Sequence, residues 1–144
     1  MEVVDTIKYK QRKYDCPYVL HLVLGMKYSI PKMGTSVPDK VFNTKVKNGL
    51  KKDGCKLVKT KLDLDLILKR DGYLELDHTP PTTITHVVAF LYNNKANSID
   101  FFDSYNKKKI HILRVKNEKA LDELFHNYFE DEFTVKNCFI IDYM

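Results

Sequence analysis

The chain has 144 residues, 44% hydrophobic and 30% charged, a composition typical of one globular domain and unlike that of a disordered or fibrous protein. Its longest apolar stretch, Val19–Met26, is much shorter than the ~20 residues of a membrane span and contains His21, and the N-terminus lacks the apolar core of a signal peptide. The net charge of +5 comes largely from three lysine-rich segments, Lys8–Lys13, Lys45–Lys61 and Lys107–Lys116. This charge favours an acidic partner, nucleic acid included, although lysine-rich segments more often form hydrated surface.

The first half of the chain predicts two helices among short strands. Pro17 is a favoured first residue of a helix, and after it Val19, Leu22, Val23 and Met26 recur at helical spacing. The expected elements are an edge strand at Val3–Tyr9, helices at Tyr18–Tyr28 and Pro38–Leu50 (with Ser36 as a cap and Val41, Phe42, Val46 and Leu50 along one side), a strand at Lys56–Lys61 and a short helix at Leu62–Arg70.

The second half predicts a sheet with one helix inserted. An amphipathic pattern through Leu121, Leu124, Phe125 and Tyr128 indicates the helix. Helices followed by a mostly antiparallel sheet define an α+β domain covering residues 1–144. The expected elements are strands at Tyr73–Leu76, His86–Tyr92, Asn97–Asp103 and Lys109–Val115, the helix Glu118–Phe129 and a buried strand at Val135–Tyr143.

The segment His86–Asn106, HVVAFLYNNKANSIDFFDSYN, has the signature of a β-hairpin, because runs of Val, Ile, Phe and Tyr flank turn residues. If Tyr92 faces Asn97, the register puts His86 opposite Asp103, on one face of the sheet. A carboxylate beside an imidazole fixes its tautomer and stabilises its protonated form, as a catalytic base requires. A surface histidine and a turn-forming aspartate that do not touch remain the alternative.

The chain has three cysteines, Cys16, Cys55 and Cys138, which are widely spaced and form no CxxC pair. This pattern argues against a disulfide framework or a zinc site and for a reducing, intracellular setting. Cys16 stands at a predicted helix N-terminus, where the helix dipole favours the thiolate. Gln11 lies five residues upstream, and its amide together with the backbone N–H of Cys16 would form an oxyanion hole. A buried helical cysteine acting as a small apolar residue is the alternative.

These residues resemble the papain-like cysteine peptidases. The order Cys16, His86, Asp103, with Gln11 upstream, is similar to the bacteriocin-type leader peptidases. The segment from His86 to the FDS at Asp103 resembles the SUMO-specific and adenovirus-type maturation proteases, in which the cysteine follows the aspartate. Cys138 is a competing nucleophile in that second order, but it has no upstream glutamine and lies within a predicted strand.

The resemblance implies a papain-like fold in which a helix carrying Cys16 packs on a sheet carrying His86 and Asp103. It implies a thiol protease or isopeptidase, a hydrolase acting on a protein or peptide substrate, and a preference for cleavage after Gly-Gly, where both related branches often cut. We expect no metal or cofactor, and we expect a location in the cytoplasm, or in a virion if the chain is a viral or mobile-element maturation protease. The alternatives are an inactive papain-like or unrelated basic α+β binding module, and a thiol acyltransferase using the same triad.

Overall fold

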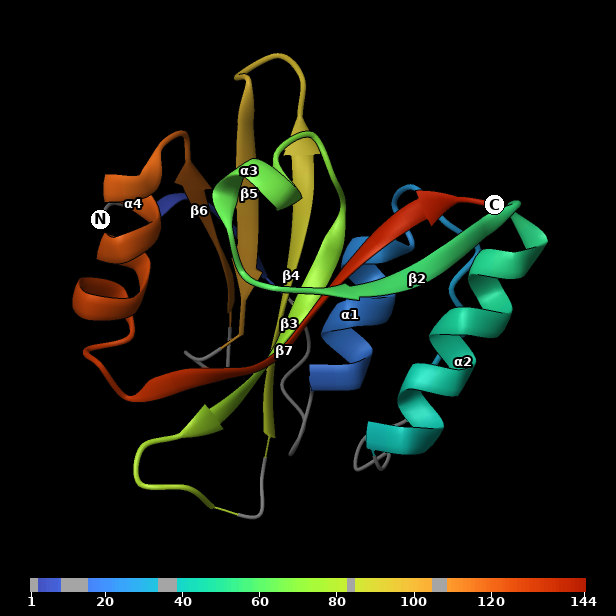
Figure 1. Ribbon diagram of the computed structural model, residues 1–144, viewed down its shortest axis with the longest axis horizontal. Coiled ribbons are helices and arrows are strands. Elements are labelled where there is room, and N and C mark those ends of the chain that lie inside the picture. Colours follow the sequence, from blue (N-terminus) through green and yellow to red (C-terminus); the bar gives the residue numbers. More distant parts are fainter. Residues whose placement is uncertain (1–2, 9–15, 34–38, 83–84, 105–108) are drawn as a thin grey trace.

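The computed structural model describes residues 3–8, 16–33, 39–82, 85–104 and 109–144, and side chains from residue 19 onward except that of Asp39 (Figure 1). Within these residues seven strands form one sheet in the order β1-β6-β5-β4-β3-β7-β2, and each neighbouring pair is antiparallel. The strands are β1 (Val3–Lys8), β2 (Cys55–Thr60), β3 (Gly72–His78), β4 (Thr85–Asn93), β5 (Ser98–Asp103), β6 (Lys109–Val115) and β7 (Phe133–Tyr143).

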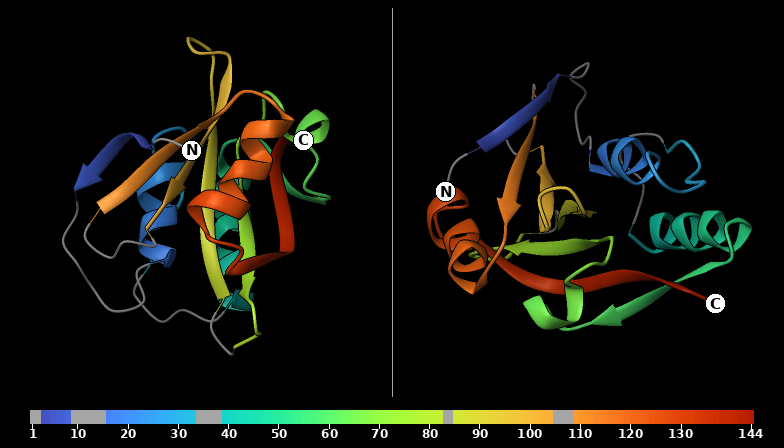
Figure 2. Two further views of the ribbon diagram at one scale, coloured as in Figure 1. Left: turned by 90° about the vertical axis from the view of Figure 1, so that its left-hand side faces the viewer. Right: turned by 90° about the horizontal axis from the view of Figure 1, so that it is seen from above.

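Helices cover both faces of this sheet, which bends so that α1 and α2 lie on its concave side (Figure 2). One apolar cluster joins α1 and α2 to the concave face, and a second cluster joins α3, α4 and the π-helical turn η1 to the other face. The arrangement confirms the α+β class. The helical elements are α1 (Cys16–Leu24), α2 (Asp39–Lys52), α3 (Leu64–Ile67), α4 (Glu118–Glu123) and η1 (Leu124–Tyr128).

Strand β4 explains why the run VVAFL carries no polar residue. Side chains alternate between the two faces of a strand, and in β4 both faces are buried. Val87 and Ala89 belong to the cluster under α1 and α2, whereas Val88 and Phe90 belong to the cluster under α3, α4 and η1. Each residue of the run therefore packs against a helical layer.

The first helix is shorter than the prediction Tyr18–Tyr28, since α1 begins at Cys16 and ends at Leu24. The chain turns at Gly25, whose N–H donates to the carbonyl of His21 at 2.9 Å. A Cβ atom at Gly25 would stand 2.4 Å from that carbonyl oxygen, so the close turn requires glycine. Met26, predicted to lie on the apolar side of the helix, is 57% exposed beyond this turn.

Two other helix predictions need correction. The segment Leu62–Arg70 forms only the single turn α3, capped by Asp63, whose carboxylate accepts from the backbone N–H of Asp65. The predicted helix Glu118–Phe129 divides into α4 and the wider turn η1, in which the N–H of Phe129 bonds the carbonyl of Leu124. In α2, Val41 is exposed beside the buried stripe of Phe42, Val46 and Leu50, and Ser36 lies outside the described residues.

The bounds of the other predicted elements are confirmed with shifts of a few residues, and Lys109–Val115 has the predicted bounds. The expected burial of the last strand is wrong in part, because Val135 is 38% and Tyr143 82% exposed. None of the helices in the described segments combines the length and apolarity needed to cross a membrane.

Candidate functional site

His86 and Asp103 contact each other in the interior of the protein. Nε2 of His86 lies 2.6 Å from Oδ1 of Asp103, and the two residues are 8% and 0% exposed. His86 is the second residue of β4, and Asp103 is the last residue of β5. The predicted proximity of this pair is confirmed.

The predicted register of the hairpin is wrong by two residues. Tyr92 pairs with Ile99, not with Asn97, and Asn93 pairs with Ser98. The side chain of Asn93 holds this turn, because its Oδ1 accepts from the N–H of Ala96 at 3.1 Å. A shift of two residues keeps every side chain on its face, so His86 and Asp103 remain on one face as diagonal neighbours.

Both carboxylate oxygens of Asp103 have hydrogen-bond donors. The Tyr128 hydroxyl donates to Oδ2 at 2.7 Å, and the His86 ring bonds Oδ1. Burial of an ionised carboxylate is costly unless such bonds satisfy it. An ionised Asp103 only accepts, so Nε2 of His86 carries a hydrogen, and Nδ1 is then the ring nitrogen with the lone pair of a base.

The bonded chain continues from Tyr128 to a second histidine. Nδ1 of His111 lies 2.8 Å from the Tyr128 oxygen. Because the Tyr128 hydrogen is committed to Asp103, His111 is the donor in this bond. His111 belongs to β6 and pairs directly with Asp103 on β5, so two strands and η1 assemble the chain His86–Asp103–Tyr128–His111.

Aromatic rings hold the His86 imidazole. Phe133 stacks on it with ring centroids 5.1 Å apart at 24°, and Phe129 meets it edge-on at 6.3 Å. Both phenylalanines are buried. The pair is thus set in an apolar layer between the sheet and η1, which strengthens its hydrogen bond relative to one in water.

The sequence patterns do not predict Tyr128 or His111 as site residues. The helical spacing places Tyr128 only on the apolar side of a helix. A tyrosine on the apolar side of a helix is buried, and its hydroxyl then requires a hydrogen-bond partner. This requirement is the one indication in the sequence that Tyr128 bonds a polar group in the interior. His111 carried no comparable local signal.

The described part of the structure does not show whether Cys16 and Gln11, the other two predicted site residues, lie near His86 and Asp103. Cys16 is the first residue of α1, as expected, but its thiol lies outside the described part of the structure. Gln11 lies outside the described residues altogether.

Helix α1 lies on the opposite face of β4 from His86. Val19, Leu20 and Val23 pack with the β4 side chains of the concave face, whereas His86 contacts Phe129 and Phe133 on the other face. A thiol on α1 therefore cannot meet the His86 ring directly through the sheet.

The start of α1 lies toward the N-terminal end of β4, the end that carries His86. Just beyond α1, Lys27 Nζ donates to the carbonyl oxygen of Tyr92 at 3.0 Å, near the end of β4. This contact brings the end of α1 close to the end of β4, and Figure 1 shows the helix running in the same direction as this strand, with its first turn beside the N-terminal half of β4.

Cys138, the competing nucleophile, is a buried thiol with a raised pKa. It is 1% exposed within β7, and burial raises the pKa of its thiol to about 12. Burial, followed by the charges of Asp53 and Asp142, also raises the pKa of Cys55. Neither thiol has the lowered pKa of an activated cysteine.

Comparisons of the chain with protein-family models, with curated proteins and with solved structures gave no match. In the described part of the chain, no group of three or more His, Cys, Asp and Glu side chains is arranged to hold a metal ion.

Proposed function

We propose that the chain is a cysteine peptidase or isopeptidase with a papain-like arrangement, in which Cys16 is the nucleophile and His86 the base. The observation that carries the proposal is the buried 2.6 Å contact between His86 and Asp103. A histidine whose tautomer is fixed by an interior carboxylate is suited to proton transfer. The position of Cys16 at the start of α1 supplies a helix N-terminus for its thiolate.

In the proposed reaction Nδ1 of His86 takes the proton from the Cys16 thiol, and the thiolate attacks the substrate carbonyl carbon. The C–N bond then breaks as His86 returns the proton to the leaving amine, and a thioester remains. Water, activated by His86, hydrolyses the thioester. Asp103 orients the ring and stabilises its protonated form, and Gln11 with the N–H of Cys16 would hold the oxyanion.

The proposal requires the Cys16 thiol to meet His86 around the N-terminal end of β4, because α1 and the His86 ring lie on opposite faces. A disulfide tests this requirement without a substrate. Two cysteines form a disulfide only when their Cα atoms are ~4.4–6.8 Å apart. If the proposal is correct, residues 16 and 86 lie side by side, and a cysteine at position 86 (His86→Cys) should form a disulfide with Cys16 under mild oxidation.

Thr85→Cys is the matched control, since its side chain stands on the α1 face of the same strand. Peptide mapping by mass spectrometry identifies the linked residues. Linkage of Cys16 through position 86 supports the proposed triad. Linkage through position 85 alone places the thiol away from the base and contradicts it.

Activity is tested on peptide and ubiquitin-like substrates, including some with Gly-Gly before the cleaved bond. Cys16→Ala and His86→Ala should each abolish turnover, because nucleophile and base act as a unit. Asp103→Ala should be milder, and Gln11→Ala should lower kcat on the order of 10²–10³-fold. Full activity in Cys16→Ala would exclude this nucleophile.

The placement of α1 favours a second candidate, a non-catalytic binding module in which His86 and Asp103 are structural. In that case the buried His86–Asp103 pair only stabilises the interior. A thiol-reactive probe separates the two candidates. Labelling of Cys16 that becomes slower in His86→Ala supports catalysis, and labelling independent of His86 supports the binding module.

A further inference from the structure

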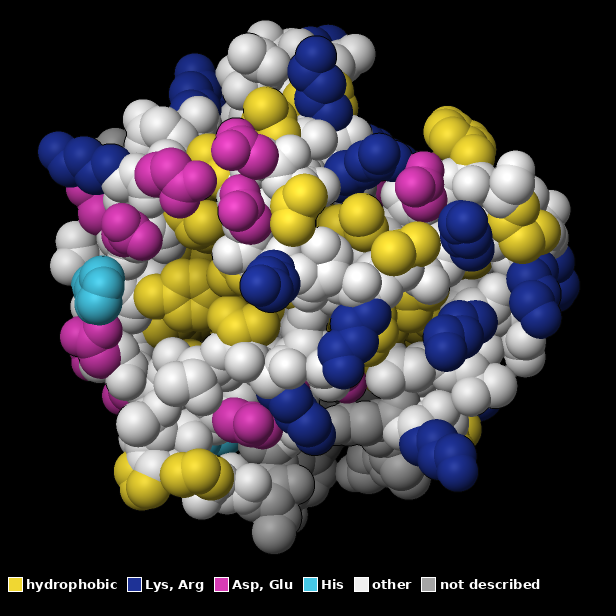
Figure 3. All heavy atoms as spheres, in the orientation of Figure 1, with side chains coloured by type: hydrophobic (Ala, Val, Ile, Leu, Met, Phe, Trp, Pro, Cys, Tyr) yellow, Lys and Arg dark blue, Asp and Glu magenta, His cyan; other side chains and the backbone are white. Residues whose placement is uncertain are grey.

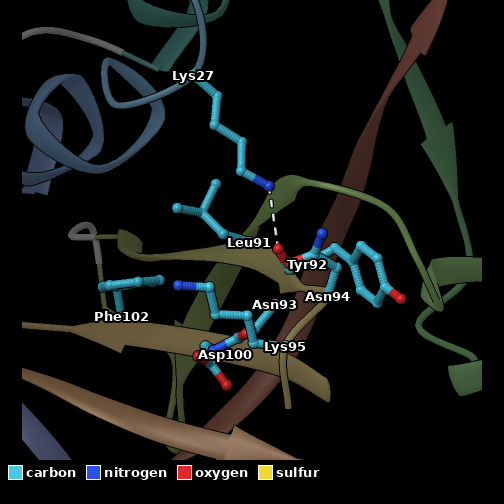
Figure 4. A pocket seen from close by; sticks show the side chains of 8 residues that line it. All are labelled: Lys27, Leu91, Tyr92, Asn93, Asn94, Lys95, Asp100 and Phe102. Atoms are coloured by element: carbon cyan, nitrogen blue, oxygen red, sulfur yellow. Dashed lines mark hydrogen bonds between the residues drawn. The ribbon is translucent and has the colours of Figure 1, made fainter. Parts of the chain in front are cut away.

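A pocket of about 490 Å³ opens beside the tip of the β4–β5 hairpin (Figure 4), and His86 is not among its lining residues. Its volume lies within the range of small-molecule sites, roughly 300–1,000 Å³. Leu91 and Phe102, which belong to the concave-face cluster, provide an apolar floor. The lining residues are Lys27, Leu91, Tyr92, Asn93, Asn94, Lys95, Asp100 and Phe102.

Two lysines enter the pocket from different sides. Lys27 comes from the segment after α1, and Lys95 comes from the hairpin turn and extends in the direction of Phe102 in Figure 4. Lys27 donates to Oδ1 of Asp71 and to the carbonyl of Tyr92, which uses two of the three ammonium hydrogens. Within the described residues, no acceptor bonds the ammonium group of Lys95.

The remaining charges of the pocket are paired. Asp100 accepts from Arg114, Asn93 and Ser98, and despite its burial these bonds hold its pKa below the usual range. Lys27 is balanced by Asp71 at 3.1 Å. One positive charge, that of Lys95, is left without a counter-charge above the apolar floor.

The turn that carries Lys95 is held in place. Asn93 joins it to the strand pair, because its Oδ1 accepts from Ala96 and its Nδ2 donates to Asp100. Because these bonds fix the backbone of the turn, a ligand that binds Lys95 does not have to order the loop first.

We propose that this pocket binds a small ligand with one carboxylate beside an apolar group. The carboxylate would accept from Lys95 and from the third hydrogen of Lys27, and the apolar group would cover Leu91 and Phe102. The single unbalanced charge matches a monoanion, and the floor matches an aromatic or branched aliphatic group. This inference does not depend on the proposed peptidase activity.

Sodium phenylacetate is the test ligand, and phenylacetamide is its uncharged counterpart. Titrations followed by amide NMR signals should give shifts that centre on residues 91–95 and 102. Phenylacetate should bind more tightly than phenylacetamide, and Lys95→Gln should raise the Kd of phenylacetate about two- to fivefold, the scale of an ion pair with an exposed lysine. The gap between the two ligands should narrow as salt is added.

Lys119→Gln on α4 removes the same charge from the opposite face and should leave the Kd unchanged. Equal binding of the two ligands would overturn the proposal, as would equal weakening by Lys119→Gln. Shifts that centre outside the pocket would overturn it as well. These outcomes leave the peptidase proposal unaffected, because no assay of turnover is involved.

Discussion

Tyr128 shows how one hydroxyl holds a buried charge in place. It gives Asp103 a second donor while His86 supplies the first, so the carboxylate is fixed from two directions. An aspartate at 0% exposure with only one donor would have an unsatisfied oxygen. Tyr128 thereby orients Asp103 toward His86 through the carboxylate that both residues bond.

We predict that Tyr128→Phe destabilises the fold by about 1–3 kcal/mol, because it removes a donor from a buried carboxylate. Chemical denaturation measures this change. The NMR signal of the His86 ring N–H should also broaden, as the carboxylate that fixes it becomes free to rotate. Tyr92→Phe is the control, since its hydroxyl is 3.5 Å from Asn97 and partly exposed, and should cost less than about 0.5 kcal/mol. Equal losses in both variants would contradict the role given to Tyr128.

Cys138 makes a second prediction at the scale of one residue. Its folded pKa, about 12, exceeds the ~8.5 of a free thiol, so between these values the unfolded state ionises and the folded state does not. Ionisation then favours unfolding, and the contribution of Cys138 to stability, complete below pH ~8.5, is lost as pH rises, by up to ~1.4 kcal/mol per pH unit. Cys138→Ala should therefore flatten the alkaline decline measured by denaturation at several pH values. An unchanged slope would show that Cys138 does not remain a thiol in the folded state.

The segment after α1 is anchored by one carboxylate. Asp71 accepts from Lys27 Nζ, from the Tyr28 hydroxyl at 2.5 Å and from the N–H of Tyr92. These bonds join the end of α1 to β4 and set the direction in which the helix crosses the sheet. Burial, then the hydrogen bond to Asp71, raises the pKa of Tyr28.

We predict that Asp71→Asn lowers the pKa of Tyr28 toward its ordinary value, because the negative charge beside the hydroxyl is removed. Burial remains, so the return should be partial. An ultraviolet absorbance titration, compared with that of Tyr28→Phe, isolates this tyrosine. The same substitution should cost about 1–3 kcal/mol of stability through the lost ion pair and altered bonds. A Tyr28 titration that does not move would mean that burial alone sets its pKa.

The pattern of the sequence was sufficient to predict most elements and the His86–Asp103 contact. Alternation of side chains specifies which face each residue occupies, and a shift of two residues leaves that assignment intact. The contact was therefore predictable, whereas the register was not. The choice between Asn93 and Asn94 as the start of the turn depends on hydrogen bonds of Asn93 to Ala96 and Asp100.

The position of α1 relative to His86 could not be obtained in this way. Helical spacing identifies the apolar side of α1, but both faces of β4 are apolar, so either face could receive the helix. The same ambiguity applies to Tyr128, because the sequence does not specify which face of the sheet its helical segment covers. Tertiary packing, and not local preference, decides these points.

At the scale of the whole molecule, the sheet ends in strand β2, which pairs with β7 alone among the described strands. The unpaired backbone groups of an edge strand can pair with another copy of the chain. Lys56 and Lys59 are exposed on this short strand, and Figure 3 shows several basic side chains, in dark blue, on the surface around β2 and α2. Charge on an edge opposes such pairing, because association would bring like charges together and strip their water.

We predict that the double substitution Lys56→Val and Lys59→Val promotes self-association through β2. Valine favours strand pairing and removes the charge at the edge. Sedimentation velocity over a range of concentrations should show a dimer or larger species that the unmodified chain lacks at the same concentrations. Lys116→Val with Lys119→Val is the control, since it adds the same apolar surface at exposed positions outside β2. Association of the control to the same extent would attribute the effect to surface hydrophobicity, and a monomeric edge variant would show that the lysines of β2 are not what keeps this edge unpaired.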